Sequence, residues 1–274
     1  MRARIVDAFA EQPFTGNPAG VVLLGDSGWP EDVLMRQVAS ELNLPMTAFA
    51  HPLGYDPDAD WALRWFMPLK EERLCGHATL AVAHALAEDG VAGHVRFRTL
   101  AGILSTHAAS DRTITLDFPA AELDEAPLPE GLPQALGAEP VRAWRTGALR
   151  DLVVELADEA SVRAAAPDLA AISTLNQRGD IRGLTITALS DPGRSYDFVS
   201  RFFSPNDGQG EDAVTGSAHT ALAPLWAERL GRTELTAFQA SERTGRLGLV
   251  VKGDRVHISG RAVTVLDGQL QLDR

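Results

Sequence analysis

The feature that most constrains the fold of this 274-residue chain is a segment that occurs twice. In each copy a strand-like aromatic run meets a proline, and two carboxylates and a glycine that opens a helix follow it. The first copy covers residues 64–90 and the second covers residues 201–231. Such an internal repeat predicts two similar halves that face each other, each offering the N-terminus of a helix.

The second copy holds the clearest candidate site. Asp212 stands just ahead of a turn of small residues, and an apolar run over 218–230 predicts a helix that Gly231 ends. The first amides of a helix have no partner within it and lie at the positive end of its dipole. A small anion could therefore bind the N–H groups of Gly216 and Ser217, with Asp212 at its edge to give or take a proton. The alternative is that Asp212 and Ser217 only cap the helix.

The first copy offers a histidine and the only cysteine of the chain. His77 follows Gly76 at the predicted helix start, where its imidazole could move protons, orient a substrate carbonyl or satisfy the helix end. Cys75 could be a small buried residue. It could also be a thiol that the helix N-terminus activates for acid/base chemistry. We expect His84, inside the alanine-rich helix, to be structural.

Four motifs in order resemble those of the PhzF family, which are phenazine-biosynthesis-type isomerases with a fold like that of diaminopimelate epimerase. The motifs are FTGNPAGVVLL at 14–24, LCGHATLAVAHAL at 74–86, RFFSP at 201–205 and EDAVTGSAH at 211–219. The resemblance implies an α+β fold of two similar diaminopimelate-epimerase-like halves. Each half would be a mixed sheet wrapped around a central helix, with an active-site cleft between them. We assign residues 1–120 and 262–274 to the N-terminal half and residues 121–261 to the C-terminal half.

The resemblance also implies an activity. PhzF-type enzymes move a proton on a small carboxylate without a cofactor, which gives a double-bond shift or tautomerisation. We expect an amino-acid-derived substrate and a biosynthetic or specialised-metabolite pathway, such as antibiotic biosynthesis. The resemblance makes Asp212 the main acid/base, with His77 and Ser217 assisting. The residues expected to bind the substrate are Gly76, Gly216, Asn17, Cys75 and Met46. Asn17 could equally be part of a plain hairpin connection. Family members are commonly homodimers, so a homodimer is expected.

Met46 is the main departure from the family pattern. Family members typically carry a glutamate here as the general acid/base, and a thioether cannot exchange a proton. Either other groups catalyse a non-standard reaction, or the usual chemistry is lost. An epimerase or racemase that uses Cys75 and Asp212 stays open, as does a non-catalytic protein that binds a small acid. Glu72 and Arg73 also stand where the family usually has an apolar residue and an aspartate.

Composition excludes several classes of protein. The net charge of −12 argues against a nucleic-acid partner. No apolar run approaches the roughly 18–20 residues that a membrane helix needs. The N-terminal residues lack the apolar core of a signal peptide, so we expect a cytoplasmic protein. The sequence has no metal-ligand cluster, dinucleotide fingerprint or P-loop, and so predicts no metal and no organic cofactor.

Periodicity predicts the remaining elements. Residues 30–42 are expected to form an amphipathic helix with a stripe of Val33, Leu34, Val38 and Leu42, and residues 159–166 a polar helix. We take the proline-rich residues 119–140 as the crossing between halves, and residues 263–272 as a return to the first half. Strands are expected at 4–9, 19–24, 61–66, 94–99, 103–108, 113–118, 152–156, 184–189, 235–239, 247–251 and 255–259.

Overall fold

The chain divides into two compact units in the computed structural model, which describes residues 1–68, 70–208 and 210–272. Unit 1 comprises Met1–Asp117 and Ser259–Arg274, and unit 2 comprises Phe118–Ile258. The chain thus leaves unit 1 once and returns to it at the end.

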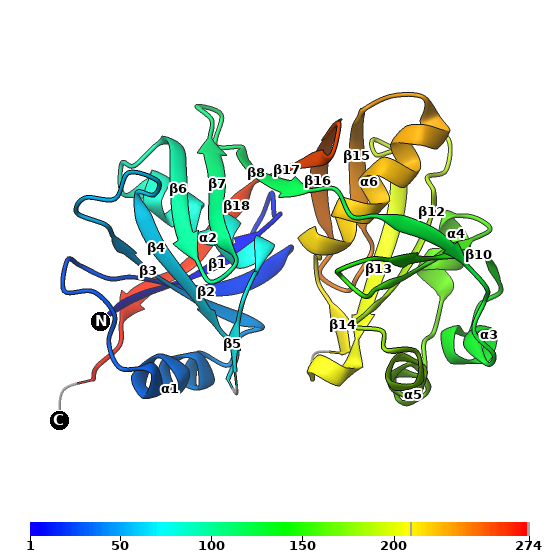
Figure 1. The fold of residues 1–274 in the computed structure, drawn as a ribbon, viewed down its shortest axis with the longest axis horizontal. Helices are drawn as coiled ribbons and strands as arrows, with labels where there is room; N and C mark the ends of the chain where they lie inside the picture. Colours follow the sequence, from blue (N-terminus) through cyan, green and yellow to red (C-terminus); the bar gives the residue numbers. More distant parts are fainter. Residues whose placement is uncertain (69, 209, 273–274) are drawn as a thin grey trace. The chain divides into compact units, whose positions relative to one another are not determined.

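Unit 1 is a mixed sheet around a central helix (Figure 1). Its strands lie in the order β8–β7–β6–β4–β3–β2–β1–β18, with β5 beside the end of β4. The pairs β2–β3 and β4–β6 are parallel, whereas β1–β2, β1–β18, β3–β4, β6–β7 and β7–β8 are antiparallel. The elements are β1 (Arg2–Ala8), β2 (Asn17–Leu23), α1 (Asp32–Leu42), β3 (Met46–Pro52), β4 (Trp61–Phe66), β5 (Glu71–Glu72), α2 (Gly76–Glu88), β6 (Gly93–Thr99), β7 (Gly102–Ala108), β8 (Ile114–Pro119) and β18 (Ala262–Gln269).

The central helix α2 is apolar on every face, which suits a helix enclosed by strands. Ten of its 13 residues are buried, and four of these are alanines, whose small side chains allow the strands to come close. It contacts β1, β2, β3, β7 and β18. The core of unit 1 therefore forms between α2 and the inner face of the sheet.

Unit 2 repeats this arrangement around α6. Its strands lie in the order β9–β10–β11–β12–β13–β15–β16–β17, with β14 beside the end of β13. The pairs β11–β12 and β13–β15 are parallel. The elements are β9 (Leu123–Ala126), α3 (Leu132–Leu136), β10 (Pro140–Thr146), β11 (Leu152–Leu156), α4 (Glu159–Ala164), α5 (Leu169–Gly179), β12 (Leu184–Leu189), β13 (Phe198–Ser204), a 3-10 turn η1 (Pro205–Asp207), β14 (Gly210–Asp212), α6 (Gly216–Leu230), β15 (Glu234–Gln239), β16 (Gly245–Lys252) and β17 (Arg255–Gly260).

The two units share their strand pairing, so the predicted internal repeat is confirmed. In unit 1 the long strand β4 is antiparallel to the short β5 and parallel to β6, with α2 between β5 and β6. In unit 2 the long strand β13 is antiparallel to the short β14 and parallel to β15, with α6 between β14 and β15. The α+β fold of two similar halves, each with a mixed sheet and a central helix, is likewise confirmed.

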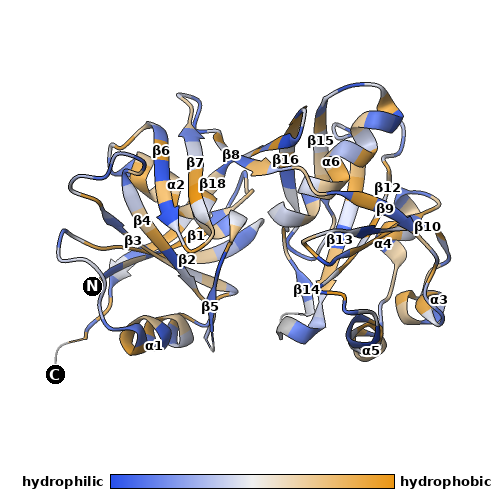
Figure 2. Cartoon of the chain, viewed as in Figure 1, coloured by the Kyte–Doolittle hydropathy of each residue, from blue (hydrophilic) through white to orange (hydrophobic). Residues whose placement is uncertain are grey.

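Several local expectations needed correction. Helix α1 begins at Asp32, and Val33 in the expected stripe is 53% exposed. The buried residues of α1 are Met35, Val38 and Ala39, which share one helix face at spacings of three and four. Figure 2 accordingly shows hydrophobic and hydrophilic stretches along α1. Residues 119–140 are not a bare crossing, since they contain β9 and α3, and α5 was not expected.

The final segment behaves as expected. Strand β18 pairs antiparallel with β1 over the whole length of β1, and the Leu270 N–H donates to the Met1 carbonyl at 2.8 Å. Unit 1 is thus completed by residues from both ends of the chain.

Candidate functional site

In unit 2 the turn between β14 and α6 is fixed by a buried glutamine. Thr215 Oγ1 donates a hydrogen bond to Asp212 Oδ2. The Thr215 N–H donates to Gln239 Oε1 at 2.8 Å, and Gln239 Nε2 donates to the Asp212 carbonyl at 2.8 Å. Gln239 is fully buried at the end of β15. Sequence reasoning missed Gln239; its only signal was an amide at the end of an otherwise apolar strand.

This turn places Asp212, Gly216 and Ser217 at one end of α6, as expected. Asp212 is the last residue of β14, Thr215 is the N-cap in an extended conformation, and Gly216 is the first helical residue. Among the described residues, the Thr215 side chain makes no capping hydrogen bond to α6. Its hydroxyl is directed to the Asp212 carboxylate instead, so the threonine fixes the carboxylate beside the start of the helix.

An arginine that sequence reasoning did not single out contacts Ser217. Arg182 Nη2 lies 3.1 Å from Ser217 Oγ and donates to it. The same guanidinium forms two hydrogen bonds, of 2.9 and 2.5 Å, with the carboxylate of Asp151, which is 2% exposed. The guanidinium also lies over the Phe202 ring at 5.5 Å. Since Ser217 Oγ accepts from Arg182, the serine hydroxyl proton is available to a different acceptor.

His219 is a core residue of unit 2. It is fully buried, and desolvation lowers its pKa to about 4, so the ring is neutral at pH 7. Nδ1 lies 2.8 Å from the Thr215 carbonyl and Nε2 lies 3.3 Å from Ser200 Oγ. A carbonyl only accepts, so Nδ1 carries the proton and Nε2 accepts from the serine. His219 thereby holds the first turn of α6 against β13.

In unit 1 the corresponding end of α2 carries Cys75, Gly76 and His77. Cys75 is the N-cap residue and is 7% exposed, and its Sγ lies 3.5 Å from His77 Nδ1. Desolvation lowers the pKa of His77 to about 4, so this imidazole is neutral at pH 7. A neutral imidazole can donate and accept hydrogen bonds, which suits orienting a substrate better than releasing a proton.

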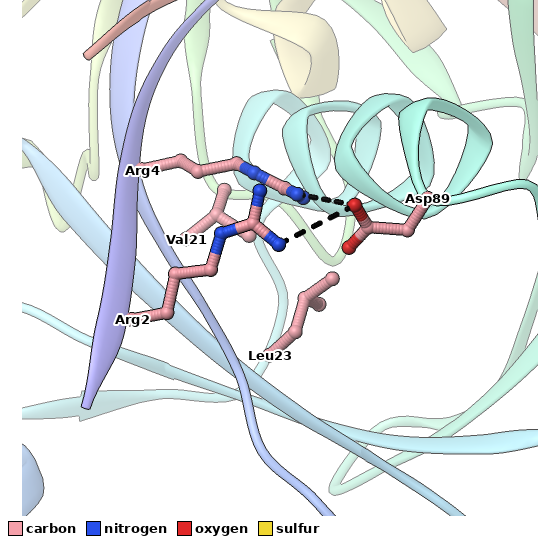
Figure 3. Close-up of a pocket in the computed structure, with 5 residues that line it drawn as sticks. All are labelled: Arg2, Arg4, Val21, Leu23 and Asp89. Atoms are coloured by element: carbon pink, nitrogen blue, oxygen red, sulfur yellow. Dashed lines mark hydrogen bonds and ion pairs between the residues drawn. The ribbon is translucent and has the colours of Figure 1, made fainter. Parts of the chain in front are cut away.

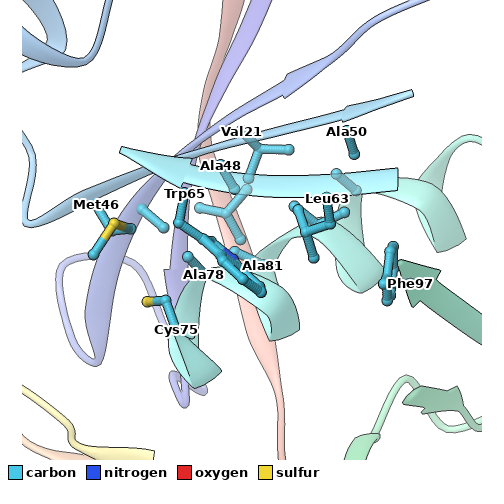
Figure 4. Close-up of a cluster of buried hydrophobic side chains, with 14 of the residues drawn as sticks. Val21, Met46, Ala48, Ala50, Leu63, Trp65, Cys75, Ala78, Ala81 and Phe97 are labelled. Atoms are coloured by element: carbon cyan, nitrogen blue, oxygen red, sulfur yellow. The ribbon is translucent and has the colours of Figure 1, made fainter. Parts of the chain in front are cut away.

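The other expected residues of unit 1 lie in the sheet beside α2. Met46 begins β3, is 5% exposed, and packs in the apolar cluster that contains Trp65 and Cys75 (Figure 4). Asn17 begins β2 and is fully buried. It lies two residues before Ala19, which pairs with Met46. The structure thus places Asn17 and Met46 at the starts of two neighbouring strands.

The carboxylates that precede each helix divide between two faces of their strand. Arg64 makes hydrogen bonds of 2.7 Å to both oxygens of Glu71, and Arg201 makes bonds of 2.7 and 2.9 Å to those of Glu211. The neighbouring Glu72 forms an ion pair with Lys70, with 2.7 Å between Glu72 Oε1 and Lys70 Nζ. The Glu72 side chain is 30% exposed. Glu71 and Glu211 are therefore structural partners of an arginine.

Two cavities lie in unit 1 at the opposite end of α2 from His77. One of about 110 Å³ is lined by Arg2, Arg4, Val21, Leu23 and Asp89, and both arginines pair with Asp89 (Figure 3). The other, of about 730 Å³, adjoins the last turn of α2 and includes His84, which lies 3.3 Å from Glu88. Burial lowers the pKa of His84. Neither cavity includes an expected site residue.

Two structural features are absent from residues 1–68, 70–208 and 210–272. No group of three or more His, Cys, Asp or Glu side chains in this part of the chain could hold a metal ion. None of its helices is long and apolar enough to span a membrane.

Comparison with known proteins identifies the family. The model of the PhzC-PhzF family, described as phenazine biosynthesis-like protein, matches residues 6–268. A Pseudomonas aeruginosa protein named as an uncharacterised isomerase is 44% identical over 97% of both chains. A PhzF-family crystal structure from Enterococcus faecalis is 38% identical, with a TM-score of 0.90 over 99% of both chains. A P. aeruginosa protein described as a predicted epimerase shares the fold, with a TM-score of 0.72 and 22% identity over 99% of both chains. The chain is therefore a member of the PhzC-PhzF family of phenazine biosynthesis-like proteins.

Proposed function

We propose that the protein is an isomerase that moves a proton on a small amino-acid-derived carboxylate without a cofactor, giving a double-bond shift or tautomerisation. The observation that carries this proposal is the geometry at the start of α6. There a carboxylate, Asp212, is held by Thr215 beside helix amides and the Ser217 hydroxyl. Two Pseudomonas aeruginosa relatives of the protein are named as uncharacterised isomerases, which supports the same reaction class.

Each site residue has a role in this proposal. Asp212 takes or returns the proton, because a carboxylate can do both. In unit 2 the N–H group of Gly216 and the Ser217 hydroxyl bind the substrate carboxylate, and in unit 1 the N–H group of Gly76 is a donor for a substrate anion. The neutral imidazole of His77 hydrogen-bonds a substrate carbonyl. Asn17 and Cys75 complete the binding surface of unit 1, and Met46 presents an apolar contact where the family usually has a glutamate.

The direct test is hydrogen exchange in heavy water. The probe compounds are the proteinogenic L-amino acids, pyruvate and 2-oxoglutarate, ranked by how much each raises the melting temperature of the protein. The best binder should take up solvent deuterium at carbon. Asp212→Asn keeps the shape but removes the titrating group, so the exchange rate should fall about 10²-fold or more while the ligand still binds. Full turnover in Asp212→Asn would place the chemistry on a different residue.

Two alternative functions, epimerisation or racemisation and non-catalytic binding, are each supported by one observation in unit 1. An epimerase or racemase would use Cys75 and Asp212, and the 3.5 Å contact between Cys75 Sγ and His77 Nδ1 favours it, because the neutral imidazole could accept a hydrogen bond from the thiol and orient it. A protein that only binds a small acid is favoured by the buried thioether of Met46. An epimerase should invert a stereocentre and lose activity in Cys75→Ala, and a pure binder should exchange no hydrogen.

The proposal extends to the setting of the enzyme. We propose a homodimer, as is common in the family, and a cytoplasmic protein in a biosynthetic or specialised-metabolite pathway, such as antibiotic biosynthesis.

A further inference from the structure

Arg182 and Asp151 form an ion pair beside the start of α6 in unit 2. Asp151 directly precedes β11, and Arg182 lies two residues before β12. The Asp151 side chain is 1% exposed, and its two oxygens accept from Arg182 Nε at 2.9 Å and from Nη2 at 2.5 Å. Nη2 also donates to Ser217 Oγ at 3.1 Å. The pair therefore links the starts of two strands to the first turn of α6.

The Arg182 guanidinium is held on several sides. Besides the two hydrogen bonds to Asp151, it lies over the Phe202 ring at 5.5 Å. That ring fills the space beside Gly183, where an added Cβ would lie 2.1 Å from Phe202 Cζ. The Arg182 N–H donates to the Arg150 carbonyl at 2.6 Å. A planar guanidinium held in this way loses little further freedom when it donates to the serine.

The strand register places the Asp212 side chain on the same face of the sheet as this guanidinium. Asp212 lies directly opposite Phe202 in the antiparallel pair of β14 and β13. Residues directly opposite each other on antiparallel strands point to the same face. Since Arg182 lies over the Phe202 ring, the guanidinium is on this face too. Arg182, Ser217 and Asp212 therefore gather at one end of α6.

The contact with Arg182 limits what the Ser217 hydroxyl can do. A hydroxyl has one hydrogen and two acceptor lone pairs, whereas a guanidinium only donates. One lone pair of Ser217 Oγ accepts from Arg182, so the hydroxyl hydrogen points to another acceptor. The first N–H groups of α6 are donors without a partner inside the helix. A ligand carboxylate has two oxygens that accept such hydrogens, and a primary amide has one.

We infer that Arg182, held by Asp151, is a positioning residue of unit 2: it fixes the Ser217 hydroxyl as a hydrogen-bond donor, and the site thereby selects a carboxylate over a neutral amide. This inference rests on the proposed function, in which Ser217 binds the substrate carboxylate. The proton transfer remains with Asp212. A contact that is equally strong in the bound substrate and in the transition state changes the affinity and leaves the rate of the bound complex unchanged.

The test measures, on the full chain, the Kd of the best binder among the amino and oxo acids named above and its rate of deuterium uptake at saturation. Arg182→Lys keeps a cation beside the buried Asp151, so that carboxylate is not left unpaired. An ammonium lacks the planar fork that reaches both Asp151 oxygens and the serine together. The Kd should rise about tenfold, as expected for one lost hydrogen bond, while the exchange rate at saturation stays within a few-fold.

The matched control is Arg150→Lys. The Arg150 side chain is 58% exposed beside Asp180, so the same change there should alter neither the Kd nor the exchange rate. A second comparison uses the primary amide of the same probe acid, formed at the carboxyl group next to the amino or oxo carbon. The wild-type protein should bind the acid more tightly than the amide, and Arg182→Lys should narrow this difference.

A double-mutant cycle with Ser217→Ala separates positioning from a general effect on the fold. Ser217→Ala should weaken binding about as much as Arg182→Lys does, and combining the two should weaken it by no more than about twofold further. If Arg182→Lys weakens binding equally with and without Ser217, or binds acid and amide as the wild type does, the assignment of Arg182 is wrong and the proposed function stands.

The remaining outcomes also separate the inference from the proposed function. If the wild-type protein binds a probe acid but exchanges no hydrogen with it, the proposed isomerase activity fails, and the Kd values still decide the role of Arg182. If Arg182→Lys lowers the exchange rate at saturation as much as Asp212→Asn does, Arg182 takes part in the chemical step and the positioning role is wrong. If no probe acid binds the wild-type protein, both fail.

Discussion

At the residue scale, the side chain of Met46 lies in an apolar environment that is unfavourable for a carboxylate. Its side chain is 5% exposed and packs in the cluster of Trp65, Met67 and Cys75. A glutamate here would need a partner to remain ionised, since an unpaired buried charge is costly. The apolar packing of Met46 supports the proposal that this residue forms an apolar part of the binding surface.

Met46→Glu tests that interpretation. We expect the unfolding free energy of the variant to fall by about 1–3 kcal/mol, because the variant buries a polar group without a partner. It should also bind the best probe acid less tightly than the wild type. Met46→Leu is the control, since an isosteric apolar change costs less than about 1.5 kcal/mol and should preserve binding and turnover. If the Met46→Glu protein gains activity and binds the probe acid as tightly as the wild type, this interpretation is wrong, and Met46 is a replacement that removed activity.

At the element scale, the short helix α4 depends on contacts outside itself. Six residues are too few for a helix to be stable alone. Asp158 Oδ1 accepts from the Ser161 N–H at 2.7 Å, which caps the helix. The fully buried carboxylate of Glu159 accepts from the Tyr196 hydroxyl at 2.5 Å and from the Asp191 N–H at 2.9 Å. Glu159 thus ties α4 to the segment that leads into β13.

This tie predicts a pH dependence of stability. Burial opposes ionisation of Glu159, but hydrogen bonds from Tyr196, Asp191 and Arg163 outweigh it and lower the pKa from 4.5 to about 2. The folded state therefore favours the ionised form. The contribution to stability is complete above pH 4.5 and is lost as the pH falls from about 4.5 to about 2. A difference of this size corresponds to about 3 kcal/mol.

Urea unfolding of Glu159→Gln across this range measures the effect. At pH 7 the variant should be less stable than the wild type by a few kcal/mol, and the gap should narrow below pH 4.5. The control is Asp180→Asn, whose carboxylate is 80% exposed beside Arg150 and should contribute little at any pH. A gap that stays constant down to pH 2 would mean that Glu159 ionisation does not contribute.

The elements also show what sequence patterns could predict. Strands β4, β11 and β12 were recovered at their observed bounds, because branched and aromatic side chains mark buried strands. The elements α3 and β9 were missed, because prolines at 127, 129 and 133 made their segment resemble a linker. The site residues at the helix starts were found from the repeat. Gln239 and Arg182 were not, because their contacts with Thr215 and Ser217 cross 24 and 35 residues of sequence and exist only in the folded unit.

At the scale of the whole molecule, the two units depend differently on the order of the chain. Unit 2 is one continuous segment, Phe118–Ile258, with its own core cluster that includes Leu136, Val154, Ile186 and Phe203. Unit 1 needs two segments, because β18 near the C-terminus pairs with β1 along its full length. Removing β18 would expose one edge of β1 and leave its backbone N–H and C=O groups without their strand partner.

Two truncations should therefore behave in opposite ways. A fragment of residues 118–258 should fold alone, because its size is typical of a domain and its core is internal. We expect it to unfold cooperatively in urea and to show native-like dispersion in NMR spectra. A chain ending at residue 261 should lose protection from hydrogen exchange in β1, β2 and α2 while keeping it in β12, β13 and α6. Equal loss of protection in both units would contradict this division, because β18 pairs with β1, a strand of unit 1.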